Sequence, residues 1–154
     1  MILLIIVGLV CTRGYKNSGG NYHLARFYKV PYKIGRSEIK SEIDRAADQH
    51  RIPRNVMQAL AHVESGLNPK AVSHCGAIGV TQVMPFNARR CGLIPSDLFD
   101  ATHNVRCGSK ILQEEIERLG NIRDALTVYN CGKIKCTEGR EYATKVLNLA
   151  KKLG

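Results

Sequence analysis

The sequence predicts a mainly α-helical domain of five or six helices with one small extended region near residues 77–83. Apolar residues recur at helical spacing through most of the chain after residue 36, and capping residues, glycines and prolines separate these segments. Within the expected domain, residues 71–83 combine Gly76 and Gly79 with several β-branched residues. A chain of 154 residues, of which 44% are hydrophobic and 23% charged, can form one domain with a core. We therefore expect a single domain with an N-terminal extension.

The first expected helix covers residues 38–50 and ends near His50. Ser37 precedes it and belongs to the residue types that cap helix N-termini. One stripe at helical spacing holds its apolar side chains, which are Ile39, Ile43 and Ala46 or Ala47.

The second expected helix begins at Pro53, which suits a first helical turn, and ends before Gly66. Its apolar face consists of Val56, Met57, Leu60 and Ala61. Glu64 lies at the edge of this face, in the last turn. The C-terminal end of a helix carries partial negative charge, so an ionised carboxylate is unfavourable there and a solubilising residue would more naturally be cationic. Glu64 is therefore a candidate functional residue.

The rest of the chain predicts a turn followed by four helices. Residues 71–83 are expected to form a tight turn with short extended pieces. The expected helices are a short one from Pro85 to Gly92, a long one from Thr102 or Asn104 to Leu119, one capped by Asn121 over residues 122–130, and one capped by Thr137 over residues 139–153.

The N-terminus divides into two segments before the domain at residues 37–154. Residues 1–12 are apolar and resemble a signal h-region or a membrane-contacting segment, although they fall short of the roughly 20 residues needed to span a bilayer. A mistranslated start or a buried terminal strand is the alternative. Residues 13–36 are basic and rich in tyrosine, and they predict an arm that either packs on the domain or stacks on sugars or bases.

Charge and cysteine content restrict the partners and the compartment. The formal net charge of +10 favours anionic partners such as cell-wall polymers, nucleic acid or lipid headgroups. Six cysteines are many for a cytosolic chain, and export would permit disulfides. The Cys131–Cys136 spacing suits a disulfide across a small loop, whereas the paired short spacings of a zinc site are missing. We expect structural disulfides or buried thiols, and no metal.

Three sequence blocks occur in order, and no P-loop, Rossmann, HExxH or Gly-x-Ser-x-Gly motif is present. The first block is ALAHVESGLNPKAVS and contains Glu64 and Ser65. The second is GAIGVTQVMPFNARRCG and contains Gln82 and Met84. A helix starting NVRCG and the block VYNCG follow. Together these blocks resemble the catalytic domain of the soluble-type lytic transglycosylases, relatives of goose-type lysozyme, over roughly residues 37–153.

The resemblance implies a lysozyme-like α+β superfamily fold and cleavage of the β-1,4 bond between N-acetylmuramic acid and N-acetylglucosamine in peptidoglycan. It implies that Glu64 is the single acid/base and that no metal or organic cofactor takes part. Peptidoglycan strands are the implied partner, and no specific nucleic acid is expected. The implied substrate-binding residues are Ser65, Gln82, Met84, Tyr129 and Asn130. Among them, the resemblance implies that Ser65 and Gln82 help orient the substrate or the reacting carboxyl.

Glycosidic chemistry agrees with this assignment. A carboxyl donates a proton near neutral pH only when desolvation raises its pKa, and Glu64 lies at the edge of an apolar face. Hydrolases add a second carboxylate, but no Asp or Glu lies between Glu64 and Asp97, and Asp97 and Asp100 are expected to cap or to be solvated. The family solves this by closing the 6-hydroxyl of muramic acid onto the anomeric carbon, which gives a 1,6-anhydro product.

Two alternatives stay open on the sequence. One is a hydrolytic muramidase that uses the same Glu64 with a bound water. The other is a non-catalytic basic module that binds wall glycan or nucleic acid. For an active enzyme we expect the periplasm, the cell envelope or a virion as its place of action, with residues 1–36 as the contact to a membrane, a virion or a secretion apparatus.

Overall fold

The computed structural model describes residues 34–154, so the expected leader and nearly all of the expected arm lie outside the described residues. This part of the chain contains five α-helices and two short 3-10 helices. In chain order they are α1 (Arg36–Gln49), α2 (Arg54–Ser65), η2 (Pro85–Cys91), η3 (Pro95–Phe99), α3 (Ala101–Leu119), α4 (Ile122–Cys131) and α5 (Thr137–Leu153). The predicted mainly α-helical class is confirmed.

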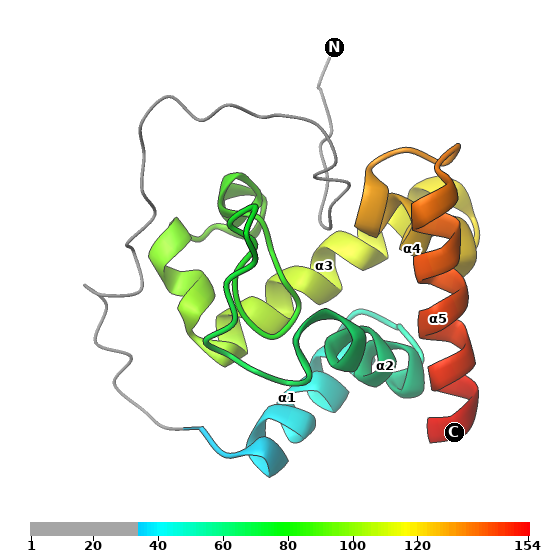
Figure 1. Ribbon diagram of the computed structural model, residues 1–154. Helices are drawn as coiled ribbons and strands as arrows, with labels where there is room; N and C mark the ends of the chain where they lie inside the picture. The colour runs from blue at the N-terminus through cyan, green and yellow to red at the C-terminus, as the bar shows by residue number, and fades with distance from the viewer. Residues whose placement is uncertain (1–33) are drawn as a thin grey trace.

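Helix α3 runs through the middle of the molecule, with α1 packed against both α2 and α3 (Figure 1). Helix α5 packs against α2 and α4, so the C-terminal helix lies beside the helix that carries Glu64. The two 3-10 helices pack against α3 and each other. The largest fully buried side chains of this core include Ile39, Ile43, Met57, Leu60, Ile78, Leu98, Leu112, Leu126 and Tyr129.

The expected extended region is present as a compact turn between α2 and η2. Ile78 forms isolated antiparallel bridges with Val72 and with Val83, and the Ile78 and Val83 backbones exchange two hydrogen bonds of 3.0 Å. Residues 34–154 contain no longer strand. Hydrogen bonds from side chains of α2, α3 and α4 hold this short turn in place.

The predicted start of the first helix was wrong by two residues. Gly35, not Ser37, is the N-cap of α1. The carboxylate of Glu38 accepts a hydrogen bond of 2.7 Å from the backbone N–H of Gly35, which is the backward half of a capping box. This bond lets the helix begin before the serine, whose hydroxyl is therefore not needed as a cap.

Two other helices also begin earlier than the sequence indicated. Asp100 caps α3 by accepting a hydrogen bond of 2.9 Å from the backbone N–H of His103, so the helix starts at Ala101. Cys136 occupies the N-cap of α5, where its sulfur accepts from the backbone N–H of Gly139 at 3.4 Å. Cysteine is not among the residue types that usually cap helix N-termini. Cys136 therefore occupies the N-cap because of its place in the chain and not because of its residue type.

Two disulfides join pairs of cysteines that both lie within residues 34–154. Cys91 at the end of η2 is joined to Cys107 on α3, and Cys131 at the end of α4 is joined to Cys136 at the start of α5. The predicted Cys131–Cys136 bond is confirmed, and Cys107 is a disulfide partner and not a plain buried thiol. The described residues contain no free cysteine.

Within residues 34–154, no helix is both long enough and apolar enough to cross a bilayer.

Candidate active site

Glu64 lies in the last turn of α2, one residue before the end of the helix at Ser65. Its side chain is half-buried, at the edge of the apolar face as predicted. The hydroxyl of Tyr142 on α5 donates a hydrogen bond of 2.6 Å to Oε1 of Glu64. The packing of α5 against α2 therefore brings together a phenol and a carboxyl that are 78 residues apart in the sequence.

Burial raises the pKa of Glu64 from its ordinary value of 4.5 to about 7. The hydrogen bond from Tyr142 and the positive charge of Lys145 both act in the opposite direction, because each stabilises the carboxylate. Desolvation is the larger effect. At neutral pH the carboxyl is thus close to half protonated, which allows it to donate a proton and later to accept one.

Tyr129 is buried beneath the turn and does not reach the surface. Its hydroxyl donates a hydrogen bond of 2.9 Å to the backbone carbonyl of Thr81. Burial and, second, the nearby charge of Glu64 raise the pKa of Tyr129 well above its ordinary range, so the phenol stays protonated. Tyr129 thus lies within electrostatic range of Glu64, but its hydroxyl bonds to the turn at Thr81 and not to the carboxyl. Asn130, the next residue, is half-buried.

Ser65 connects the end of α2 to the same turn. Its hydroxyl donates to the carbonyl of Val80 at 2.8 Å and accepts from the backbone N–H of Asn68 at 3.0 Å. Since Ser65 follows Glu64 directly, these bonds fix the backbone that carries the carboxyl. These bonds are compatible with the role in orienting Glu64 that the resemblance implies for Ser65, and that role stays a prediction.

Gln82 is buried in the turn, with a positive φ of 52° that a side-chain-bearing residue rarely adopts. Its Nε2 donates to the carbonyl of Gly79 at 3.0 Å and to that of Ala71 at 3.3 Å. The amide N–H groups of Gln82 thus connect two backbone carbonyls of the same loop, those of Gly79 and Ala71. Met84 is half-buried and forms the N-cap position of η2.

Asn104 on α3 holds the turn more completely than any residue singled out from the sequence. Its Oδ1 accepts from the backbone N–H and the hydroxyl of Thr81, both at 2.8 Å. Its Nδ2 donates to the carbonyls of Ile78 at 2.7 Å and Leu98 at 3.0 Å. All four of these hydrogen bonds are buried, so the amide ties the turn and Leu98 to α3 with every polar atom of its side chain satisfied.

Gly108, one helical turn after Asn104, provides the space for this contact. A Cβ built on Gly108 would lie 2.7 Å from Cβ of Thr81 and 3.0 Å from the hydroxyl of Tyr129. A side chain at this position would push both residues away from α3. The asparagine and the glycine at i and i+4 of NVRCG face the same side of the helix, and that spacing is the signal that could have identified them.

Tyr142 is the contact that sequence reasoning missed. It lies 78 residues from Glu64, on a helix for which only the range and the capping residue were predicted. No local pattern marks it, because its role depends on how α5 packs against α2. The pKa of Tyr142 is also raised well above its ordinary range, first by burial and then by the charge of Glu64, so it remains a hydrogen-bond donor.

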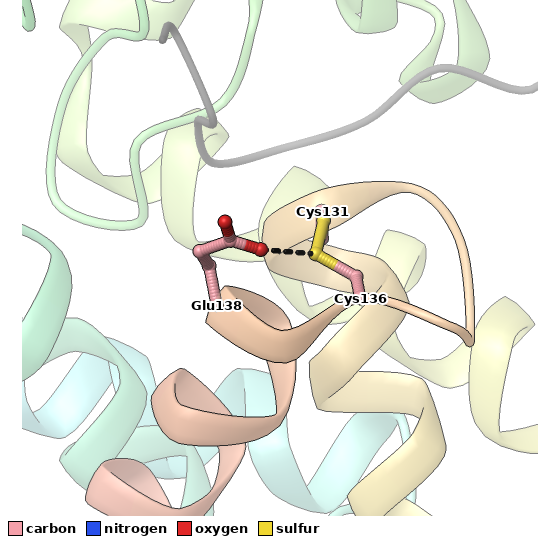
Figure 2. Close-up of side chains that lie close together, drawn as sticks. All are labelled: Cys131, Cys136 and Glu138. Atoms are coloured by element: carbon pink, nitrogen blue, oxygen red, sulfur yellow. Dashed lines mark hydrogen bonds between the residues drawn. A yellow bond between two sulfur atoms is a disulfide. The ribbon is translucent and has the colours of Figure 1, made fainter.

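One group of potential metal ligands occurs in the described part of the chain, at the junction of α4 and α5. It consists of Cys131, Cys136 and Glu138 (Figure 2). The two sulfurs form a disulfide, and Sγ of Cys136 lies 3.3 Å from Oε2 of Glu138. A disulfide offers no thiolate, so this group acts as a covalent clamp between the two helices.

Comparison with known sequences agrees with this geometry. The model of the transglycosylase SLT domain family matches residues 41–148. The transglycosylase of Enterobacteria phage PRD1 is 30% identical over 108 residues, which are 68% of this chain and 40% of that protein. The membrane-bound lytic murein transglycosylase C of Haemophilus influenzae (strain PittEE) is 31% identical over 106 residues, which are 60% of this chain and 30% of that protein. The chain thus matches less than half the length of either relative.

Solved structures confirm the lysozyme-like fold that the resemblance implied. The 70 kDa soluble lytic transglycosylase of Escherichia coli matches with a TM-score of 0.65 and 26% identity, over 71% of this chain and 23% of that one. A complex of the 70 kDa soluble lytic transglycosylase with bulgecin A matches with the same TM-score and 25% identity, over 71% and 23%. On the match across residues 41–148, this chain belongs to the transglycosylase SLT domain family.

Proposed function

We propose that this protein is a peptidoglycan lytic transglycosylase. It cleaves the β-1,4 bond between N-acetylmuramic acid and N-acetylglucosamine and leaves a 1,6-anhydro sugar, with Glu64 as the sole acid/base. The observation that carries the proposal is the half-buried Glu64, whose pKa of about 7 suits proton transfer in both directions at neutral pH. Family membership and the lytic murein transglycosylases among the relatives support the same reaction.

The reaction needs one carboxyl if the substrate supplies its own nucleophile. Protonated Glu64 donates its proton to the glycosidic oxygen, and the bond from that oxygen to the anomeric carbon of muramic acid breaks. The resulting carboxylate then takes the proton of the 6-hydroxyl while the 6-oxygen bonds to the anomeric carbon. Atoms and charge balance, no water is consumed, and Glu64 returns to its protonated form.

Asp97 and Asp100, the first two acidic residues after Glu64 in the sequence, are engaged as caps, which supports a single-acid mechanism. Asp97 accepts a hydrogen bond of 3.0 Å from the backbone N–H of Ile94. Asp100 caps α3. A hydrolase with inversion or retention would need a second carboxylate placed roughly 5 to 9.5 Å from the acid. Both aspartates instead have the capping role that the sequence predicted.

We assign the remaining predicted residues to the substrate groove around Glu64. Ser65 and Gln82 shape its floor by fixing the end of α2 and the turn, and Tyr129 supports that turn from below. Met84 and Asn130 are half-buried and are proposed to contact the glycan directly.

We also propose that the protein acts on the cell wall from the envelope or from a virion, with residues 1–36 making contact with a membrane, a virion or a secretion apparatus. The phage and membrane-bound relatives support this setting. Salt-dependent flotation of the full chain with vesicles containing anionic lipid, compared with a chain starting at residue 34, tests the membrane part. Equal flotation of both forms would count against it.

The source of the oxygen at the new sugar end tests the reaction type. Digestion of purified peptidoglycan in H₂¹⁸O is expected to release anhydro muropeptides without ¹⁸O, each lighter by one water than the hydrolysis product. Products that carry ¹⁸O would identify a hydrolytic muramidase. A protein that binds glycan, releases nothing and loses its affinity steeply with salt would be the non-catalytic basic module.

A further inference from the structure

The junction of α4 and α5 holds side chains of metal-binding types that the proposed reaction does not use. Cys131, Cys136 and Glu138 place two sulfurs and a carboxylate oxygen within 4.8 Å of one another (Figure 2). Both cysteines are buried, whereas Glu138 is exposed to solvent. The sulfurs of a disulfide do not bind a metal, because the thiolate is the ligand. The reduced form of the same junction is therefore a different chemical site.

The distances within this group are close to those around a bound zinc ion. Zn–S bonds of about 2.3 Å and Zn–O bonds of about 2.1 Å, at tetrahedral angles, place a sulfur and an oxygen about 3.6 Å apart and two sulfurs about 3.8 Å apart. Sγ of Cys136 already lies 3.3 Å from Oε2 of Glu138. Rotation of one cysteine side chain about χ1 provides the separation of the sulfurs once the bond between them is broken.

Positive groups at the junction compensate the charge of two thiolates and a carboxylate. The backbone N–H of Gly139 donates to Sγ of Cys136 at 3.4 Å. This contact lies at the N-terminal end of α5, which carries partial positive charge. Lys133 and Lys135 are exposed on the loop between the two cysteines. Such surroundings favour the thiolate over the thiol, and the thiolate is the form that a metal requires.

The types of ligand select the kind of metal. Thiolates suit Zn²⁺, whereas Mg²⁺ and Ca²⁺ prefer sites made of oxygen atoms alone. Three protein ligands leave the fourth tetrahedral position to water. The sequence lacks the paired short spacings of a common zinc motif, and the third ligand comes instead from the first turn of α5.

We propose that the reduced protein binds Zn²⁺ at this junction through Sγ of Cys131, Sγ of Cys136 and a carboxylate oxygen of Glu138. A dithiol supplies the reduction: its two sulfurs join as a disulfide, and its two electrons and two protons pass to the cysteine pair as the bond between them breaks. Zn²⁺ then displaces both protons. The junction thus joins α4 to α5 in both redox states, through a disulfide when oxidised and through a metal ion when reduced.

Titration with Co²⁺ tests this site, because Co²⁺ takes the place of Zn²⁺ and absorbs light in a way that reports bound thiolates and tetrahedral geometry. The full chain is reduced with dithiothreitol, separated from it without oxygen and then titrated. The reduced protein is expected to form a tetrahedral thiolate complex that Zn²⁺ displaces, and the oxidised protein to form none.

Glu138→Gln tests the third ligand, and Glu141→Gln is its matched control. Loss of a group that only supports a ligand already weakens metal binding about 10- to 100-fold, so Glu138→Gln is expected to weaken Co²⁺ binding at least about tenfold. Glu141→Gln removes the same charge from another exposed position on α5, outside the group, and is expected to leave the affinity unchanged.

Alkylation of the wild type identifies the cysteines without any substitution, which matters because dithiothreitol also reduces the Cys91–Cys107 bond. Zn²⁺ is expected to slow the reaction of Cys131 and Cys136 with iodoacetamide and to leave Cys91 and Cys107 as reactive as before, as read by mass spectrometry of peptides. Protection of Cys91 and Cys107 instead, equal Co²⁺ affinity in Glu138→Gln and Glu141→Gln, or no complex in the reduced protein would overturn the inference.

Discussion

The hydroxyl of Tyr142 on α5 donates a hydrogen bond of 2.6 Å to Oε1 of Glu64 on α2, a residue 78 positions away in the sequence. This bond opposes the effect of burial, because it stabilises the charged form of a carboxyl whose pKa burial has raised to about 7. The pair thus sets the protonation of Glu64 as a balance of desolvation against a hydrogen bond. The predictions below start from that balance.

Tyr142→Phe is expected to raise the pKa of Glu64 further, because it removes a hydrogen bond to the carboxylate. A bond to a charged group contributes about 1.5 kcal/mol, which is about one pKa unit. Activity depends on protonated Glu64, so the alkaline limb of kcat/KM against pH should move up by about one pH unit. In Tyr129→Phe, whose hydroxyl contacts the Thr81 carbonyl, the limb should stay in place. A limb that moves down in Tyr142→Phe would contradict the account.

Glu64 is expected to make folding less favourable as the pH rises. Its folded pKa of about 7 lies above the ordinary 4.5, so the folded state holds the proton longer than the unfolded state does. The free energy of unfolding should therefore fall between pH 4.5 and 7, by roughly 3 kcal/mol in total if the whole difference is expressed. Urea unfolding of Glu64→Gln should lack this slope and show higher stability than wild type at pH 8. Identical pH dependence in both proteins would rule out the raised pKa.

Gly108→Ala is expected to destabilise the fold, although glycine in an open helix is normally the less stable residue by about 0.5–1 kcal/mol. The added methyl group would meet Thr81 and the hydroxyl of Tyr129, which the Asn104 network holds in place. We expect a loss of about 1–3 kcal/mol, in the range of overpacked cores. The measurement is the urea midpoint at constant slope, and a gain in stability would show that the turn yields easily.

The Cys91–Cys107 and Cys131–Cys136 disulfides are expected to contribute unequally to stability. Cys91 and Cys107 are 16 residues apart, and Cys131 and Cys136 are 5 apart. A chain-entropy estimate gives about 3 kcal/mol for the longer loop and about 2 kcal/mol for the shorter one. Denaturant unfolding of the two double Cys→Ser variants checks the order of these losses. A larger loss for the shorter loop would indicate that the α4–α5 clamp stabilises the folded state by more than loop closure.

Local patterns in the sequence predicted the helices, the turn and the position of Glu64. The apolar stripe of α2 and Gly66 after it determine both the end of the helix and the edge on which Glu64 lies. Helix starts were less predictable: Glu38 reaches back to Gly35, and a cysteine caps α5. Such caps depend on single side-chain contacts and leave little trace in periodicity.

The supporting residues of the site could not be predicted in the same way. Tyr142 and Asn104 act on segments 78 and 23 or more residues away, so their roles exist only once the helices are packed. The role expected of Gln82, to orient the substrate or the carboxyl, stays a prediction, and the bonds from its amide N–H groups to the carbonyls of its own loop were not indicated by the sequence. Long-range packing decides these contacts, whereas periodicity reports only the face that each helix buries.

Digestion of purified peptidoglycan by wild type and by Glu64→Gln, with the released muropeptides identified by mass, tests the central claim most directly. Gln keeps the shape of Glu64 and can still accept the hydrogen bond from Tyr142, but it cannot donate a proton as an acid. We predict 1,6-anhydro muropeptides from the wild type and a loss of at least about a hundredfold in their rate of release from the variant. Release of the same products at a similar rate by Glu64→Gln would contradict the assignment of Glu64 as the sole acid/base.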